Sequence, residues 1–306
     1  MVPESGLTLE AAAPFVKHFR GRTFVLKMSG ALLEDAHALD EAASQIALLE
    51  ALGIRLVLVH GGGSQANRLA ERLGVPQKQV AGRRVTDDAT LEVVTMAFSG
   101  KARTALLAAL RRRGVSAVGL SGVDARLTVA VRRPPVQVRE PGGETHTVDY
   151  GYVADIESVH PGVLTELLDA GHLPVISPLA GDDDGQVFNI NADTLAAKLA
   201  VSLGAAKVVF LTEVRGLLRD VNDPTTLFSQ VDLSDVEELS QNGVVRGGML
   251  PKLAACRLAL EGGVERAHLV AGQDPHALLR EIFTNEGSGT LVVRDLKSTQ
   301  TPSGHA

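Results

Sequence analysis

The sequence predicts an α/β fold that is wound as parallel β-α-β units. Short, branched apolar runs, which are typical of buried strands, alternate with longer stretches that repeat apolar residues at helical spacing. The clearest unit is Leu56–Val59, which is followed by His60-Gly61-Gly62-Gly63 and by a helical pattern over Ser64–Leu73. Glycines between a strand and a helix let backbone N–H groups approach an anion, which the positive end of the helix also favours. A tight turn with nothing bound is the alternative.

In the first half of the chain, apolar spacing and turn residues define the elements one after another. Helices are expected over Leu9–Phe19, Asp35–Leu52, Ser64–Leu73 and Asp88–Arg113, and strands over Thr23–Gly30, Leu56–Val59 and Ala117–Leu120. Residues 1–22, which contain the first of these helices, are expected to form an appended element before the main domain.

Two cationic positions in this half have two interpretations each. Lys27 lies at the end of a buried strand, where an unpaired ammonium is costly, so it either reaches solvent or faces an anion. Arg83 and Arg84 follow Gly82 in a turn. They are either solvated or form a guanidinium fork for a substrate carboxylate.

Residues 126–156 interrupt the β-α-β rhythm. Polar and apolar residues alternate on both sides of Pro141-Gly142-Gly143, which predicts a β-hairpin excursion. We interpret this excursion as a flap over a site and its basic run as a solvated face.

The second half continues the same pattern. Helices are expected over Pro161–Ala170, from Thr194 to Leu203, over Ser234–Leu239, from Gly247 to Leu260 and over Pro275–Phe283, and strands over Leu173–Ser177, Lys207–Thr212, His268–Val270 and Gly289–Val293. A lobe boundary is expected at the acidic loop Gly181–Gly185, which separates a lobe at 23–180 from a lobe at 181–294. We interpret this loop as solvated rather than metal-binding, and residues 295–306 as a frayed tail.

Two polar groups in this half are candidate site residues. Asn189 and Asn191 alternate in an extended segment, so their amides share one side of it, at a strand-to-helix junction of the kind that often carries a site. Asp193, just after them, is either part of this cluster or a helix N-cap. Lys252 lies at a helix N-terminus, where the macrodipole disfavours a cation unless an anion is bound.

Composition narrows the class of protein. The chain has 306 residues, 45% hydrophobic and 22% charged, with a net charge of -6, which argues against nucleic acid or an anionic membrane as the main partner. The single cysteine, Cys256, excludes an intrachain disulfide and a cysteine-based zinc site. No apolar run approaches the ~20 residues that span a bilayer, and no signal-peptide pattern opens the chain, so a cytoplasmic location is expected.

Five motifs in order resemble the amino acid kinase family from about Phe15 to Val293. They are Lys27 with Gly30, His60-Gly61-Gly62-Gly63, Gly82-Arg83-Arg84-Val85-Thr86, Asn189-Ile190-Asn191-Ala192-Asp193 and Gly247-Gly248-Met249-Leu250-Pro251-Lys252. The chain is most similar to the members that phosphorylate N-acetyl-L-glutamate in arginine biosynthesis. This resemblance implies an open, three-layer αβα sandwich with a mainly parallel sheet, an acyl amino acid in the first lobe and MgATP in the second.

The resemblance also implies a role for each motif. Lys27 and Lys252 would be the cations on the transferring phosphoryl group, and Asp193 would orient both. Gly30, Gly62 and Gly63 would supply backbone donors around the phosphates and the substrate. Arg84 would bind the substrate α-carboxylate, with Asn189 near it and Asn191 supporting.

These roles suit the transfer of a phosphoryl group from ATP to a γ-carboxylate, which gives N-acetylglutamyl 5-phosphate. A glutamate-type carboxyl has a pKa of ~4.3 and is ionised at neutral pH, so no general base is required. The difficulty is the approach of two anions, which lysines, Mg²⁺ and backbone N–H groups reduce. We expect Mg²⁺ to arrive with ATP rather than in a protein-ligated metal site.

Some residues depart from the family pattern, and others indicate regulation. Ser29 replaces a usual glycine, Glu213 replaces a usual aspartate, and Tyr150–Asp155 differs slightly from the usual hairpin end. The N-terminal helix resembles that of arginine-inhibited, hexameric members. We therefore expect arginine to bind through the regulatory residues, Lys207, Glu281 and the Gly287 backbone, in a homodimer or a trimer of dimers.

Two other functions are compatible with the same motifs. A kinase that acts on aminoadipate or glutamate attached to an acidic carrier protein would need more basic surface near Arg84. A non-catalytic, arginine-sensing domain would not need Lys27, Lys252 and Asp193, all of which are present.

Overall fold

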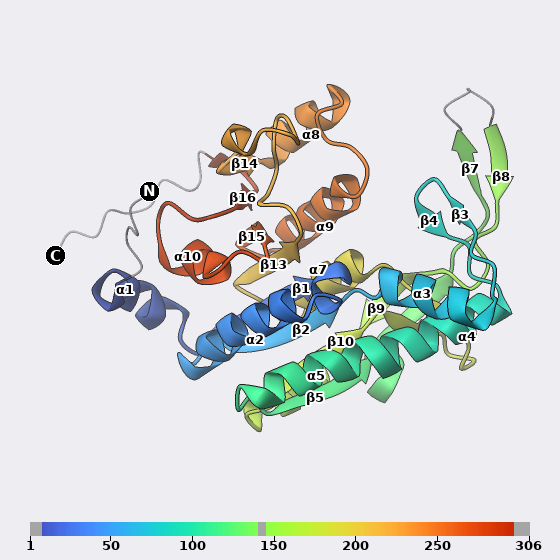
Figure 1. Cartoon of the computed structure of the whole chain (residues 1–306), viewed down its shortest axis with the longest axis horizontal. Coiled ribbons are helices and arrows are strands. Elements are labelled where there is room, and N and C mark those ends of the chain that lie inside the picture. Colours follow the sequence, from blue (N-terminus) through green and yellow to red (C-terminus); the bar gives the residue numbers. More distant parts are fainter. Residues whose placement is uncertain (1–7, 140–144, 297–306) are drawn as a thin grey trace.

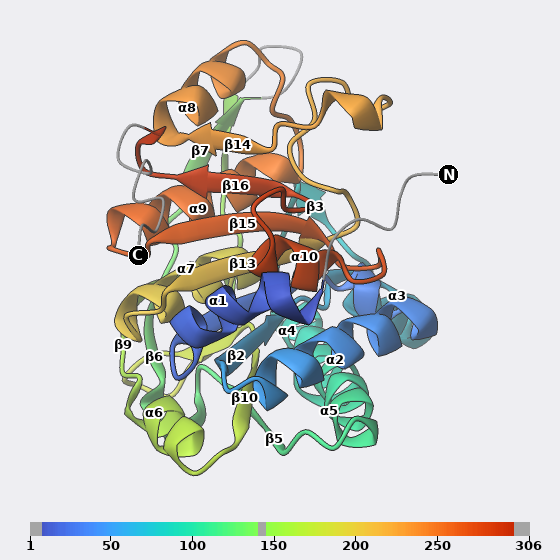
Figure 2. The same ribbon diagram turned by 90° about the vertical axis from the view of Figure 1, so that its left-hand side faces the viewer.

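An eight-stranded sheet runs through the molecule (Figures 1 and 2), as the computed structural model of residues 8–139 and 145–296 shows. The strand order is β14-β16-β15-β13-β1-β2-β10-β5, and every neighbouring pair is parallel except β15 with β16. The strands are β1 (Thr23–Met28), β2 (Arg55–His60), β5 (Ala117–Ser121), β10 (Leu173–Ser177), β13 (Lys207–Thr212), β14 (Gln230–Asp232), β15 (Arg266–Ala271) and β16 (Thr290–Val293). The predicted open, mainly parallel sheet is confirmed.

Helices cover both faces of this sheet. One apolar core lies under α1 (Leu9–Phe19), α2 (Ala36–Ala51), α5 (Arg103–Arg112) and α10 (Ala277–Phe283), and the other under α6 (Gly162–Asp169), α7 (Ala192–Ser202), α8 (Leu233–Gln241) and α9 (Met249–Glu261). Alternate residues of β1 enter opposite cores, because side chains of a strand point to opposite faces. Phe24 and Leu26 lie in the first core and Val25 lies in the second. The sheet between these two layers of helices confirms the predicted three-layer sandwich.

Local capping residues explain where several helices begin and end. Thr8 accepts a hydrogen bond from the Ala11 N–H at the start of α1, and Asp35 accepts from the His37 and Ala38 N–H groups at the start of α2. Gly53 has a φ of +85° after the end of α2, a conformation that favours glycine. These residues are the start and stop signals that the sequence offers.

The helical run from Asp88 to Arg112 contains a π-helical segment. It consists of α4 (Asp88–Thr95), the π segment η2 (Met96–Ala102) and α5. In the described part of the chain it is the one run whose length and apolar composition would suffice to cross a membrane, and 44% of its most apolar window is buried. Because α5 packs against α2 and β5, it is a core helix of this domain.

A second, four-stranded sheet lies beside the main one, and two of its strands belong to the hairpin excursion that the sequence predicts, whose Pro141-Gly142-Gly143 turn lies outside the described residues. Its order is β12-β11-β6-β9, from β12 (Val187–Asn189), β11 (Leu179–Gly181), β6 (Thr128–Arg132) and β9 (Ala154–Val159). The excursion is two nested hairpins, since β6 pairs with β9 and β7 (Val136–Arg139) pairs with β8 (Thr145–Val148). Another small hairpin consists of β3 (Gln79–Val80) and β4 (Arg83–Arg84), which are antiparallel. The expected lobe boundary at residue 181 falls at the end of β11 and stays a prediction.

Short elements connect these layers. They are α3 (Gly63–Leu73), the 3₁₀ turns η1 (Ala31–Leu33), η3 (Asp124–Arg126) and η4 (Pro224–Thr226). The acidic loop Asp182–Asp184 is a turn in which Asp182 accepts hydrogen bonds from the backbone N–H groups of Asp184 and Gln186. Asp183 pairs with Arg126 on the surface.

Candidate active site

A buried ion pair joins the end of the central strand β1 to the first turn of α7. The Lys27 Nζ lies 2.8 Å from Asp193 Oδ1, and the two side chains are 7% and 9% exposed. Asp193 Oδ1 forms this ion pair with Lys27 but accepts no hydrogen bond from the described residues. Lys27 therefore does not reach solvent as one interpretation had it. Its ammonium is held inside, next to the carboxyl edge of the sheet.

Two glycine turns meet beside this pair. A Cβ added to Gly30 would lie 3.1 Å from Gly62 N, and a Cβ on Gly61 would lie 2.9 Å from Gly30 N. Gln65, in the first turn of α3, donates from Nε2 to the Gly30 carbonyl at 2.7 Å. Gly63 faces open space. The turns after β1 and β2 are thus packed backbone to backbone, as expected where a ligand is bound by main-chain N–H groups.

Arg84 is a half-buried cation that reaches the glycine turn from the β3–β4 hairpin. Its guanidinium donates to the Gly63 carbonyl at 3.0 Å, to Asn67 Oδ1 at 2.7 Å and to Gln77 Oε1. Burial lowers its pKa below the usual value. None of these acceptors is charged, and no acidic side chain of the described residues pairs with Arg84. A substrate carboxylate would supply the missing charge.

Asn189 is connected to the same hairpin through Thr86. Its Nδ2 donates to Thr86 Oγ1 at 3.2 Å, and its backbone N–H donates to the Tyr152 carbonyl. The Tyr152 N–H in turn donates to the Thr86 carbonyl. Tyr152, in the segment that differs from the usual hairpin end, and Thr86, which follows the β3–β4 hairpin, therefore fix the position of Asn189.

Asn191, rather than Asp193, is the N-cap of α7. Its Oδ1 accepts a hydrogen bond from the Thr194 N–H at 2.8 Å, which leaves Asp193 free to pair with Lys27. This resolves the two interpretations of Asp193.

Lys252 lies in the first turn of α9, and its Nζ donates to the Gly248 carbonyl at 3.3 Å. It forms no ion pair within residues 8–139 and 145–296. The helices α7 and α9 pack together, and the charges of Asp193 and Lys252 act in opposite directions on the pKa of the buried Cys256 thiol. Burial is the main cause that raises the pKa of that thiol. Lys252 and Asp193 thus lie on two helices that pack against each other.

The two departures from the expected motif contact each other. The Ser29 hydroxyl donates to Glu213 Oε1 at 2.7 Å, from the end of β1 to the end of β13. The Ser29 N–H donates to the Leu211 carbonyl. Ser29, which replaces the usual glycine, and Glu213, which replaces the usual aspartate, are therefore hydrogen-bonded to each other.

Residues 22–271 match the amino acid kinase family. The chain belongs to the amino acid kinase family. A similar relative is the acetylglutamate kinase of Myxococcus xanthus, which is 50% identical over 99% of this chain and 98% of its own length. Another is the acetylglutamate kinase of Heliobacterium modesticaldum, which is 42% identical over 95% of this chain and 98% of its own length.

Among solved structures, the chain resembles the N-acetylglutamate synthase of Neisseria gonorrhoeae in complex with coenzyme A and N-acetyl-glutamate. The TM-score is 0.79 and the identity 32%, over 94% of this chain and 63% of the synthase. The same synthase with coenzyme A and L-arginine gives a TM-score of 0.78 at 30% identity, over 94% and 65% of the two chains. This amino acid kinase thus spans less than two thirds of the synthase but nearly the full length of the kinases above.

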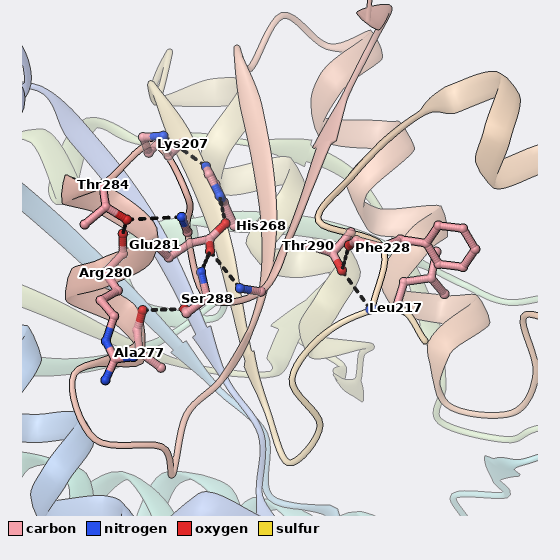
Figure 3. Close-up of polar contacts among 12 residues, drawn as sticks. Lys207, Leu217, Phe228, His268, Ala277, Arg280, Glu281, Thr284, Ser288 and Thr290 are labelled. Carbon is pink, nitrogen blue, oxygen red and sulfur yellow. Dashed lines mark hydrogen bonds and ion pairs between the residues drawn. The ribbon is translucent and has the colours of Figure 1, made fainter. Parts of the chain in front are cut away.

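A second buried cluster contains Lys207 and Glu281, two of the three residues that the sequence predicts to bind arginine (Figure 3). Lys207 Nζ lies 2.9 Å from His268 Nε2, and His268 Nδ1 lies 2.7 Å from Glu281 Oε1. The Ser288 and Gly289 N–H groups donate to Glu281 Oε2 at 2.7 and 2.9 Å. Burial raises the pKa of the Glu281 carboxyl, but the contact with His268 and the hydrogen bonds from Ser288 and Gly289 outweigh it and lower that pKa to about 2. Burial lowers the pKa of Lys207 to about 7.

Gly287 lies against this cluster and has a φ of +67°. A Cβ added there would lie 2.7 Å from Glu281 Oε2, so a side chain would displace the carboxylate. The N-terminal helix reaches the same cluster, because Lys207 Nζ stands 4.9 Å from the centre of the Phe19 ring.

Sequence reasoning missed several residues of both clusters. His268 was expected only as part of a strand, and its buried polarity between apolar neighbours was the available signal. Gln65 and Ser177 were likewise assigned no role. Gln65 contacts the Gly30 carbonyl and Ser177 contacts the His60 ring, through side-chain hydrogen bonds that no local pattern predicts.

Proposed function

We infer that this chain phosphorylates the γ-carboxylate of N-acetyl-L-glutamate with ATP, which gives N-acetylglutamyl 5-phosphate in arginine biosynthesis. The buried Lys27–Asp193 pair beside two glycine turns is the observation that carries this inference. The relatives that match nearly the whole chain, and are named acetylglutamate kinase, support it.

The chemistry of the acceptor explains the residues at the site. The γ-carboxylate is already ionised at neutral pH, so the enzyme need not remove a proton. It has to bring an anion in line with a phosphoryl group that is itself anionic, and cations and N–H donors lower the free energy of that arrangement. Lys27 and Lys252 are proposed to approach the transferring group from two sides, with Asp193 fixing Lys27.

The remaining residues are proposed to bind the two substrates. Gly30, Gly62 and Gly63 offer N–H donors to phosphate and carboxylate oxygens, and Arg84 binds the α-carboxylate. Asn189 and Asn191 complete the acetylglutamate side. In the described ranges no three His, Cys, Asp or Glu side chains are grouped to hold a metal ion, so Mg²⁺ is proposed to enter as part of the MgATP substrate.

The direct test is ATP consumption with N-acetyl-L-glutamate, with hydroxylamine added to trap the acyl phosphate as a hydroxamate. Hydroxamate should require both substrates and should be lost in Lys252→Ala. A matched control is Lys198→Ala, which removes a lysine whose Nζ donates to the Ile156 carbonyl. If the carrier-linked acceptor alone gives product, the substrate assignment is wrong. If neither acceptor reacts and ATP does not bind, the chain is an arginine sensor.

We also propose that L-arginine inhibits this enzyme by binding at Lys207, Glu281 and the Gly287 backbone. The solved synthase complex with L-arginine is the comparison that supports an arginine site in this fold. Glu281 offers a buried carboxylate to a guanidinium group, and Lys207 an ammonium to a carboxylate. Lys207→Met should raise the arginine concentration that halves activity, whereas a flat arginine titration of the wild type would exclude the site.

The resemblance to arginine-inhibited family members also supports a proposal about how the chain assembles and where it is located. We propose a homodimer or a trimer of dimers in the cytoplasm. Light scattering with and without arginine measures the mass of the assembly.

A further inference from the structure

His60 is a fully buried histidine directly before the glycine turn, and it makes two hydrogen bonds. Its Nδ1 lies 2.8 Å from the Gly61 carbonyl oxygen, and its Nε2 lies 3.0 Å from Ser177 Oγ at the end of β10. None of its side-chain surface reaches solvent. Neither Nδ1 nor Nε2 is therefore available to contact a substrate directly.

These two contacts determine the tautomer of the ring. A carbonyl oxygen only accepts, so the proton must be on Nδ1, and Nε2 must accept from the Ser177 hydroxyl. Burial and the nearby charges of Arg103 and Lys27 lower the pKa of His60 to about 4. The imidazole is thus neutral at neutral pH, with one donor and one acceptor in fixed places.

The hydrogen bond to Gly61 sets the direction of the next peptide group. No cis peptide occurs in the described chain, so the Gly61 C=O and the Gly62 N–H point to opposite sides of their peptide plane. When His60 holds the C=O, the Gly62 N–H is turned away from the ring. Gly62 N lies 3.1 Å from where a Cβ on Gly30 would be, so the missing side chain leaves room beside this N–H.

This N–H is an unused donor. Across residues 8–139 and 145–296 it donates to no protein acceptor, and α3, which begins at Gly63, has no side-chain cap. A backbone donor at such a place is expected to bind a ligand or water. An oxygen of an anion between Gly30 and Gly62 would accept it.

The π-helical segment supports the same peptide from behind. A Cβ on Gly62 would lie 2.4 Å from Phe98 Cδ1, so the ring closes the far side of the turn. The Phe98 carbonyl is a second acceptor for the Ser177 hydroxyl at 3.4 Å, but the 3.0 Å contact to His60 Nε2 is shorter, so the single hydroxyl proton is assigned to His60. A π-helical segment shifts the hydrogen bonds of its helix, and such segments are frequent at functional sites.

We propose that His60 is a positioning residue for phosphoryl transfer, which fixes the Gly61–Gly62 peptide so that the Gly62 N–H donates to the transferring phosphoryl group. Ser177 holds the ring in the tautomer that this requires, and Phe98 holds Gly62 in place. The inference rests on the proposed kinase activity, because it concerns the same site.

The test uses three variants of the network and one matched control. His60→Leu removes both hydrogen bonds, His60→Asn keeps an amide that can donate to the Gly61 carbonyl, and Ser177→Ala leaves Nε2 without its donor. Val175→Ala truncates a fully buried side chain on the same strand and the same face of the sheet as Ser177, and this apolar side chain takes no part in the hydrogen bonds of the network. Hydroxamate kinetics give kcat and KM, ADP titration gives nucleotide affinity, and thermal unfolding gives Tm.

We expect His60→Leu to lower kcat on the order of 100-fold with little change in the KM for acetylglutamate, because a donor to the transition state is misplaced. His60→Asn should recover most of that loss, and Ser177→Ala should lie between them. Val175→Ala should lower Tm and leave kcat unchanged. A purely structural His60 would instead change Tm in all variants and kcat in none, which would overturn the proposal.

Two further outcomes remain decisive. If His60→Leu does not fold, His60→Asn and Ser177→Ala carry the test, and wild-type kcat in Ser177→Ala overturns the role of the tautomer. If the wild type makes no hydroxamate, the proposed function fails separately. The affinity for a non-hydrolysable ATP analogue, which carries the phosphoryl group that ADP lacks, then decides, and equal affinity in the wild type, His60→Leu and Ser177→Ala overturns the positioning role.

Discussion

Lys27 and Asp193 place opposite charges inside the protein, where the loss of hydration opposes their attraction. Their burial at the carboxyl edge of the sheet means that the ammonium is held at one position rather than spread over many rotamers. That is a requirement for a group that has to meet a phosphoryl oxygen at a defined place.

The role of the Lys27–Asp193 ion pair can be tested by comparing a variant that removes one charge with a variant that replaces both residues by apolar ones. Asp193→Asn leaves Lys27 as an uncompensated buried cation, so we expect the free energy of unfolding to fall by about 3 to 5 kcal/mol. The double variant Lys27→Met/Asp193→Leu should recover much of that stability without recovering hydroxamate formation. Urea unfolding and the hydroxamate assay measure the two effects, and recovered activity in the double variant would contradict a catalytic role of Lys27.

For single residues, the sequence identifies candidate site residues better than it identifies the residues they contact. Lys27 and Asp193 are both anticipated because a charge at the end of a buried strand or at a strand-to-helix junction is unusual. That Asn191 takes the cap, or that His268 stands between Lys207 and Glu281, depends on side-chain geometry across distant segments. Local pattern holds no information on such distances.

At the scale of elements, strong local signals give accurate bounds. The expected bounds of α1 and β13 agree with the structure at both ends, because Thr8 caps the helix and a continuous apolar run forms the strand. The β3–β4 hairpin was missed, since two-residue strands such as Arg83–Arg84 show no alternation. The partner strands of the four-stranded sheet could not be predicted because they pair across long separations.

The contact between Gly151 and Thr86, which follows the β3–β4 hairpin, should affect the KM for acetylglutamate. Gly151 has a φ of +71°, and a Cβ there would lie 2.3 Å from the Thr86 carbonyl oxygen. Gly151→Ala should therefore shift the strand that carries Arg84 and raise the KM for acetylglutamate, on the order of 10-fold, with the KM for ATP unchanged.

Gly82→Ala is the matched control for this prediction. Gly82 also has a positive φ, +74°, but a Cβ there meets nothing within 4 Å. Its substitution should cost about 1 kcal/mol of backbone strain and leave both KM values near the wild type. Equal rises of both KM values in Gly151→Ala would show that this contact does not act on the acetylglutamate side alone.

For the whole molecule, two fully buried histidines couple folding to pH. His60 is the last residue of β2 in one half of the sheet, and His268 lies in β15 in the other. Burial lowers the pKa of each to about 4, from 6.5. Between these values the unfolded chain binds more protons than the folded one, so stability decreases as the pH falls.

We therefore expect the free energy of unfolding to fall as the pH is lowered from 6.5 towards 4. His60→Asn should reduce this slope, since it removes one of the two groups, and the part due to His268 should remain. Urea unfolding at several pH values in this window gives the slope. A slope in His60→Asn equal to that of the wild type would contradict a neutral, buried His60.

The position of β1 has a consequence for synthesis on the ribosome. This strand, the first in the described part of the chain, lies between β2 and β13, and its β13-facing edge has no partner until Lys207–Thr212 has been made. Until then the nascent chain carries an apolar strand edge whose N–H and C=O groups are open to any extended segment. The strand that holds Lys27 is therefore also the one most exposed to incorrect pairing, and its protection during translation depends on chaperones or on the speed with which the second half follows.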